Sequence, residues 1–297
     1  MNQLTSIRSD LQVATQLQHK FRADETVRSY QTGAKQFRDY CVANDVPSLP
    51  ASAETVCSFL ASLVQSGKSV STIQSRLHAI KWLHKTAGLA SPVDHPAVEM
   101  TLDGIRRQLK VAPRQAKALL AEDIKLMLNT MKSNNIIRDR AVILLGYYGG
   151  FRRSELASIR RSDLTFSGQG VIVHLAQSKT DQIGEGRDVA IARQDDPRYC
   201  PVVALQAWML EHDDERALNI SDRTVWNIIN RACKNAGFDP AGFSSHSLRA
   251  GLVTQARLNG ADKRDIRAIT GHKSDQMIDR YTRVVDAWEN NATKGLI

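Results

Sequence analysis

The chain has little of what several common protein classes require. Its four cysteines include no CxxC pair, which argues against a disulfide scaffold or a structural zinc site and fits a reducing compartment. The longest apolar run, residues 141–151, contains glycines and ends before Arg152, so it is too short to cross a membrane. There is no HExxH motif and no cluster of acidic residues of the kind that holds magnesium. We therefore expect neither a metal nor another cofactor.

The N-terminal residues also lack the basic and apolar stretches of a secretory signal, which predicts a cytoplasmic protein. What the chain does have is positive charge: 40 Lys and Arg against 31 Asp and Glu, a net charge of +9. The excess is spread, with 13 basic and 9 acidic residues in 1–110 and 27 and 22 in 111–297. This distribution favours two surfaces that each meet phosphates, although a merely basic soluble protein remains an alternative.

The first 110 residues read as successive amphipathic helices. Patterns of apolar residues at helical spacing start at Asp24, Ser52 and Ser71, and a fourth helix is expected over 96–110. Such stripes are typical of a small helical bundle. Residues 111–118 follow as a basic, proline-containing linker that is suited to an exposed path near an anion.

Residues 119–297 mix helices and strands. The apolar segment 141–151 predicts a buried central helix, whereas 171–175 and 189–192 have the β-branched character of strands in a small antiparallel hairpin. Further helices are expected from about Pro201, Asp222 and Ser245. The fold class predicted is mainly α, with a small antiparallel β-sheet in the C-terminal domain.

Charged and nucleophilic side chains gather where these predicted elements end, which is where loops commonly position function. They are Arg152, Glu155, Lys179, His246, Arg249, His272 and Tyr281. Arg152 and Glu155 share a helix face, and His246 starts a helix whose N-terminus favours a bound anion. Each residue alone also has a purely structural explanation, such as a surface salt bridge or a solvated lysine.

Five separated motifs change that balance when they are taken in order. They are GFRRSEL (150–156), SKT (178–180), HSLR (246–249), GH (271–272) and Tyr281. With these motifs the sequence resembles the tyrosine recombinase (phage integrase) family over essentially its whole length. Residues 71–92 and 105–107 resemble the core-binding domain of its Cre-like, two-domain members. The resemblance implies a helical core-binding domain over 1–110 and an α+β catalytic domain over 119–297, which together form a C-shaped clamp on DNA.

The resemblance implies that Tyr281 attacks a backbone phosphorus, which forms a 3′-phosphotyrosine and releases a 5′-hydroxyl. The covalent bond stores the energy for religation, and strand exchange passes through a Holliday junction. Arg152 and Arg249 are suited to the phosphate because guanidinium groups bind its oxygens in pairs and stay charged.

The remaining motif residues have implied roles in proton transfer and positioning. Lys179 would protonate the leaving 5′-oxygen, and His246 would accept or orient the tyrosine proton. His272 would donate to a phosphate oxygen. Glu155 would hold His246 or an arginine in place, without touching the phosphate itself.

The implied partner is double-stranded DNA with short inverted-repeat core sites. DNA-contacting candidates are the basic residues near the third helix and the linker: Lys68, Arg76, Lys81, Lys85, Arg106, Arg107 and Arg114. The family pattern implies a monomer without DNA, nucleoid-associated when bound, and a homotetramer on two paired sites, with the tail after Tyr281 docking on a neighbouring subunit. Packing of that tail on its own domain is the alternative, and a directionality factor stays open.

The sequence departs from the family at two positions: Thr270 stands where leucine is common, and Ala250 where histidine or arginine is common. Neither departure removes a functional group.

Two rival functions remain. A type IB topoisomerase uses the same phosphotyrosine chemistry, and a catalytically silent DNA-binding accessory protein could keep the fold, although it would not need Tyr281.

Overall fold

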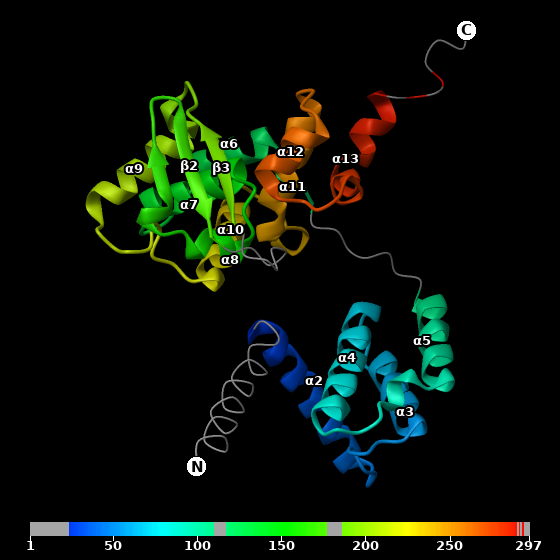
Figure 1. The fold of residues 1–297 in the computed structure, drawn as a ribbon. Coiled ribbons are helices and arrows are strands. Elements are labelled where there is room, and N and C mark those ends of the chain that lie inside the picture. Colours follow the sequence, from blue (N-terminus) through cyan, green and yellow to red (C-terminus); the bar gives the residue numbers. More distant parts are fainter. Residues whose placement is uncertain (1–23, 110–116, 177–185, 290, 292, 294–297) are drawn as a thin grey trace, which may run out of the picture. The chain divides into compact units, whose positions relative to one another are not determined.

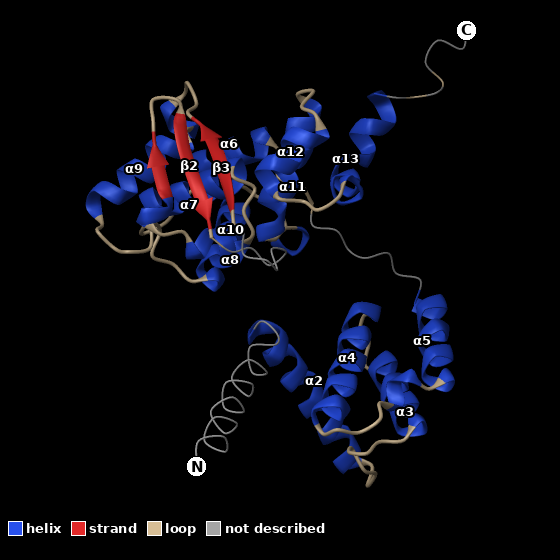
Figure 2. Cartoon of the chain, viewed as in Figure 1, coloured by secondary structure: helices blue, strands red, loops and turns tan. Residues whose placement is uncertain are grey.

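The computed structural model describes residues 24–109, 117–176 and 186–289, and also residues 291 and 293. The chain divides into two compact units, Met1–Arg114 and Gln115–Ile297, each with its own core. Figure 2 shows that helices predominate and that the strands belong to the second unit. This confirms the predicted fold class. No helix among the described residues is long and apolar enough to span a bilayer.

The first unit is a bundle of helices around an apolar core (Figure 1). Its helices are α2 (Asp24–Ala43), α3 (Ala53–Gln65), α4 (Val70–Thr86), the 3₁₀ turn η1 (Pro92–Asp94) and α5 (Pro96–Leu109). Phe37 of α2 packs edge-on against Phe59 of α3, with ring centroids 5.2 Å apart. The predicted start of the third helix at Ser71 is wrong by two residues. Ser69 is the N-cap, because its extended backbone lets its hydroxyl accept the Thr72 N–H.

The second unit contains the remaining elements. In chain order they are α6 (Ala121–Asn129), α7 (Ile136–Tyr148), α8 (Arg153–Ser158), η2 (Arg161–Asp163), β1 (Leu164–Phe166), β2 (Gly170–Leu175), β3 (Arg187–Ala192), η3 (Pro197–Tyr199), α9 (Pro201–Glu211), α10 (Asp222–Asn235), η4 (Pro240–Gly242), α11 (Ser245–Leu258), α12 (Lys263–Thr270) and α13 (Asp275–Glu289). The starts predicted for α9, α10 and α11 are confirmed. Buried residues of α7 and of the sheet share one core.

The sheet has the order β1-β2-β3, and both neighbouring pairs are antiparallel. Val173 pairs with Val189 at the centre of the β2–β3 ladder, and both side chains are buried. The β-branched runs 171–175 and 189–192 made this pair predictable, and the structure shows buried and exposed positions alternating along most of both strands. Strand β1 was not predicted, because three residues are too few to show a period.

The buried helix α7 ends earlier than predicted, at Tyr148 rather than residue 151. Gly149 is the C-cap, and Gly150 has a φ of 57°, a left-handed conformation that stops the helix. The ring of Phe151 folds back over Gly149, where an added Cβ would lie 2.1 Å from it. The chain therefore turns sharply, and Arg152 follows directly after the turn.

Residues that precede α6 bind along α11. The Lys117 N–H donates to the Gly242 carbonyl at 3.1 Å, and the Leu119 N–H donates to the Ser247 carbonyl at 3.1 Å. Gly251 of α11 allows this approach, since a Cβ there would lie 1.9 Å from the Leu119 carbonyl oxygen. The backbone from residue 117 onward is thus part of the second unit.

Candidate active site

Arg152 and Glu155 form a buried ion pair where α8 begins. Arg152 is the N-cap residue, and its backbone N–H donates to Glu155 Oε2 at 2.9 Å. Its guanidinium Nη1 donates to Glu155 Oε1 at 2.5 Å. The side chains are only 14% and 4% exposed, so this pair is not the solvated surface bridge that helical spacing alone allows. Glu155 holds Arg152 at both its backbone and its head group.

Arg187, the first residue of β3, is a second largely buried cation beside Glu155, and the sequence motifs do not include it. It donates from Nη2 to Glu155 Oε2 at 3.4 Å and from Nη1 to the Ile269 carbonyl. Its buried Nε has no hydrogen-bond partner among the described residues. Burial lowers the pKa of Arg187, Glu155 opposes that shift, and Arg152 adds to it. Its signal in the sequence is weak, because a single arginine at the start of a strand is ordinary.

Arg249 lies on α11, which Ser244 caps at its N-terminus. Its side chain is 3% exposed, and Nη1 donates to the Gly150 carbonyl at 2.6 Å. Nη2 is buried and has no hydrogen-bond partner in the part of the chain that the structure describes. Burial and the neighbouring charge of Arg152 lower the pKa of Arg249 to about 10. A buried guanidinium N–H without an acceptor is costly, and an anion would relieve that cost.

His272 follows α12 at a left-handed turn. Gly271 has φ 64° and caps the helix, which directs the next residue back toward the core. His272 is 6% exposed, and its Nδ1 lies 2.8 Å from the Thr270 hydroxyl. Burial, followed by the charges of Arg249, Arg152 and Arg187, lowers the pKa of His272 to about 3. The imidazole is therefore neutral at physiological pH.

Tyr281 lies on α13, beside His272. The two rings are tilted by 40° with centroids 6.0 Å apart. The ring of Tyr281 also packs against the small apolar cluster of Val253, Ile266 and Ile278. Its backbone carbonyl accepts the Thr254 hydroxyl of α11 at 3.1 Å. These contacts attach α13 to α11 and α12 at the residue expected to be the nucleophile.

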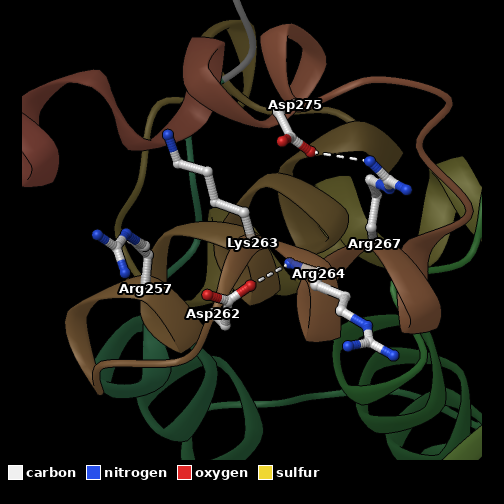
Figure 3. A pocket seen from close by; sticks show the side chains of 6 residues that line it. All are labelled: Arg257, Asp262, Lys263, Arg264, Arg267 and Asp275. Carbon is white, nitrogen blue, oxygen red and sulfur yellow. Dashed lines mark hydrogen bonds and ion pairs between the residues drawn. The ribbon is translucent and has the colours of Figure 1, made fainter.

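Ion pairs on the outer side of α12 reinforce that attachment. Arg267 binds Asp275 at 3.1 Å, and Lys263 binds Asp279 at 2.6 Å. Figure 3 shows the side chains that line a polar pocket around the first pair, to which Arg257 and Arg264 also contribute. These surface pairs are individually worth little, but they connect α12 to the first turns of α13.

The structure brings six residues into one electrostatic cluster. They are Arg152, Glu155, Arg187, Arg249, His272 and Tyr281. Three guanidinium groups stand against one carboxylate, so the cluster carries an excess of two positive charges at neutral pH. Such an excess in a largely buried site favours a phosphate. Within the described residues, no group of His, Cys, Asp and Glu is arranged to hold a metal ion.

Two predicted catalytic residues are not among these six. His246 is exposed in the first turn of α11, where its backbone N–H donates to the Ser244 hydroxyl at 3.2 Å. Lys179 lies outside the described residues, between β2 and β3.

The predicted DNA-contacting residues of the first unit differ in their surroundings. Arg76 donates to Gln36 of α2 at 2.6 Å, so it takes part in helix packing. Lys81 and Arg106 form exposed ion pairs with Asp94 and Asp103. Those with exposed side chains are Lys68, Lys81, Lys85, Arg106 and Arg107. Arg114 lies outside the described residues.

Comparison with known proteins decides the family. Residues 117–287, more than half of the chain, match the phage integrase family. The chain belongs to this family. It is a tyrosine recombinase, an enzyme that breaks and rejoins DNA strands. The resemblance drawn from the sequence motifs is thereby confirmed, and the match spans every described residue of the cluster.

Relatives extend the similarity to both units. The integrase/recombinase xerD homolog of Selenomonas ruminantium is 33% identical over 292 residues, which cover 92% of this chain and 85% of the relative. Recombinase cre of Escherichia phage P1 is 24% identical over 294 residues, covering 89% and 85%.

Solved structures share the fold. A lambda integrase dimer bound to a COC′ core site matches with a TM-score of 0.67 at 19% identity, covering 91% of this chain and 75% of the other. A lambda integrase tetramer bound to a Holliday junction gives a TM-score of 0.65 at 18% identity, covering 93% and 76%.

Proposed function

We propose that this recombinase cuts and rejoins DNA at specific sites through a 3′-phosphotyrosyl intermediate on Tyr281. The observation that carries the proposal is the buried Arg249 Nη2, which has no acceptor among the described residues although it lies close to Arg152 and Tyr281. A phosphate oxygen supplies the missing acceptor and balances the positive charge. A phosphate bound there would lie close to the phenol of Tyr281.

In this mechanism the Tyr281 oxygen forms a bond to phosphorus, and the bond from phosphorus to the 5′-oxygen breaks. His246 takes the phenolic proton, and Lys179 gives a proton to the leaving oxygen. Arg152 and Arg249 bind the non-bridging oxygens, whose negative charge grows in the transition state. Religation reverses these steps with the 5′-hydroxyl of another strand, so no external energy source is needed.

The surrounding residues position these groups. Glu155 holds Arg152 through two hydrogen bonds and joins it to Arg187. Arg187 in turn binds the Ile269 carbonyl at the end of α12, close to His272. We assign His272 to a phosphate oxygen. Because the phosphate counters the three arginines, it raises the affinity of His272 for the proton that this contact needs.

The proposed substrate is double-stranded DNA with short inverted-repeat core sites, bound by residues 1–110, the linker 111–118 and the catalytic domain 119–297. Four copies would act on two paired sites through a Holliday junction, and the protein would be monomeric without DNA. Solved structures of lambda integrase contain a dimer bound to a core site and a tetramer bound to a Holliday junction, which supports this assembly. The tail after Tyr281 would dock on the neighbouring subunit, with directionality factors as additional partners.

The test is to incubate wild-type protein and Tyr281→Phe with nicked DNA fragments that include the locus encoding the protein, without divalent metal. After denaturation, a covalent adduct at a 3′-phosphate is expected in the wild type only. Adducts or nicks that persist in Tyr281→Phe would exclude the mechanism. Salt-sensitive binding by both without any adduct would point to a silent DNA-binding protein. A topoisomerase would be indicated if the protein relaxed a supercoiled plasmid that carries one mapped site but did not recombine DNA that carries two such sites.

A further inference from the structure

Thr270 is buried at the end of α12 and makes two side-chain hydrogen bonds. Its hydroxyl oxygen lies 2.7 Å from the Ile266 carbonyl oxygen, one helical turn earlier, and 2.8 Å from Nδ1 of His272. The residue is 0% exposed, so water does not compete for either bond. The hydroxyl is therefore fixed between a backbone carbonyl and the imidazole.

These two contacts determine where the proton of the imidazole resides. A carbonyl oxygen only accepts, so the Thr270 hydroxyl must donate its single hydrogen to Ile266. The contact to His272 then has to be donated by the ring, which requires a proton on Nδ1. At neutral pH the ring carries one proton, because burial and the nearby arginines hold the pKa of His272 at about 3. The other nitrogen, Nε2, is left with its lone pair.

We propose that Thr270 is a positioning residue for catalysis: its hydroxyl fixes the proton of His272 on Nδ1 and reserves Nε2 for the substrate. This rests on the proposed function, in which His272 meets the scissile phosphate. When the phosphate enters, Nε2 takes up a proton from water and donates a hydrogen bond to a phosphate oxygen, while the Nδ1 bond to Thr270 is kept. Proton exchange is thus confined to one nitrogen.

The charged groups around His272 are consistent with this assignment. Arg187 from β3, Arg152 with Glu155 from α8, Arg249 from α11 and Tyr281 from α13 belong to the same cluster. None of these groups is hydrogen-bonded to the imidazole among the described residues, so Thr270 alone selects the tautomer. A leucine, common at this position in the family, would offer no such acceptor.

A test must distinguish the effect of the Thr270 methyl group, which packs, from the effect of its hydroxyl, which forms hydrogen bonds. Its Cγ2 lies beside Gly150, where an added Cβ would approach it to 3.1 Å. Thr270→Val keeps the branched shape and removes the hydroxyl, whereas Thr270→Ser keeps the hydroxyl and removes the methyl group. Thr270→Ala removes both and serves as a second hydroxyl-free variant if valine does not fold. Circular dichroism checks that each variant is folded.

The deciding measurement is ¹⁵N NMR of histidine-labelled, full-length, DNA-free protein at pH 7, with the His272 signal assigned by its loss in His272→Gln. Wild type and Thr270→Ser should show a protonated Nδ1 and an unprotonated Nε2. Thr270→Val and Thr270→Ala should lose that pattern, with the proton wholly or partly on Nε2. An Nε2 proton in the wild type, or an unchanged Nδ1 proton in both hydroxyl-free variants, would overturn the proposal.

Single-turnover cleavage provides the second readout. Thr270→Val should cut about 10-fold more slowly, as expected when a positioning partner is lost, and Thr270→Ser should stay close to the wild-type rate. DNA affinity should be unchanged in both. Equal cleavage rates for all variants would show that the Thr270 hydroxyl does not contribute to catalysis. Absence of cleavage in the wild type would count against the proposed function instead, and the tautomer measurement would still stand.

Discussion

The side chains at the site carry a net positive charge that favours binding of an anion such as phosphate. Arg152, Arg187 and Arg249 are all largely buried, and Glu155 balances only one of them. Burying an unbalanced charge costs free energy of folding, so the protein keeps this arrangement at the expense of stability. His272 responds to the same field by remaining neutral, because a fourth positive charge would add to the repulsion.

The neutral state of His272 predicts a specific acid sensitivity of the DNA-free protein. The unfolded chain binds a proton at this histidine near pH 6.5, whereas the folded protein resists it until the pKa of about 3. Lowering the pH through this window therefore favours unfolding, by about 1.4 kcal/mol for each pH unit. The free energy of unfolding of wild type should fall more steeply between pH 7 and pH 5 than that of His272→Gln.

Urea titrations at several pH values would measure both slopes. Other groups that titrate in the window affect both proteins alike, so the comparison isolates His272. Parallel curves for the two proteins would show that the histidine is not held neutral.

The sequence predicted which residues form the site better than it predicted the contacts of those residues. The motifs selected Arg152, Arg249, His272 and Tyr281 because their order and spacing are specific. They did not select Arg187, whose importance depends on contacts with Glu155 and Ile269 that are 32 and 82 residues distant in sequence. The partner of His272 was visible only as an unusual threonine, since hydrogen-bond direction requires coordinates.

At the level of elements, α11 is the support on which the site is built. It carries Arg249, it contacts α7, α12 and α13, and the backbone before α6 lies along it. Close contact at that last interface depends on Gly251, which has no room for a side chain beside the Leu119 carbonyl. A change there should disturb the path of residues 117–120 and not the chemistry directly.

We therefore expect Gly251→Ala to destabilise the protein by about 1–3 kcal/mol, the usual cost of overpacking a well-filled interior. Gly104→Ala is the matched control, because Gly104 is in the exposed interior of α5 with nothing near an added Cβ. That substitution should stabilise its helix by about 0.5–1 kcal/mol. Chemical denaturation of the full chain gives both values. Equal effects would mean that the Leu119–Gly251 contact is not tight.

Elements with a strong sequence pattern were the ones that the sequence predicted well. Apolar stripes gave α3, α4 and α10, and β-branched runs gave β2 and β3. The end of α7 was misplaced because 141–151 is apolar on all sides, so hydrophobicity could not mark where the Gly149–Gly150 turn interrupts the helix. Short elements such as β1 and α8 depend on their neighbours for stability and leave no periodic signal.

At the scale of the whole molecule, the net charge of +9 favours DNA, and the phosphates that individual lysines and arginines neutralise make the affinity depend on salt. Each lysine or arginine that neutralises a phosphate adds about 0.9 to the slope of log affinity against log salt concentration. Positive charges that only contribute to the general field leave that slope nearly unchanged. Salt titration therefore separates contacts from background charge, even before the target sequence is known.

Lys68 and Arg107 are exposed predicted contacts of the first unit and form no ion pair with any described residue. Replacing both by glutamine should lower the slope by about 2 and weaken binding to all DNA sequences alike. Arg28→Gln with Lys35→Gln removes the same charge from α2, where both side chains are exposed beside acidic residues. This control should keep the wild-type slope in fluorescence anisotropy titrations. If the two double variants lost the same slope, the first unit would bind through its overall charge, and the predicted contacts at Lys68 and Arg107 would be wrong.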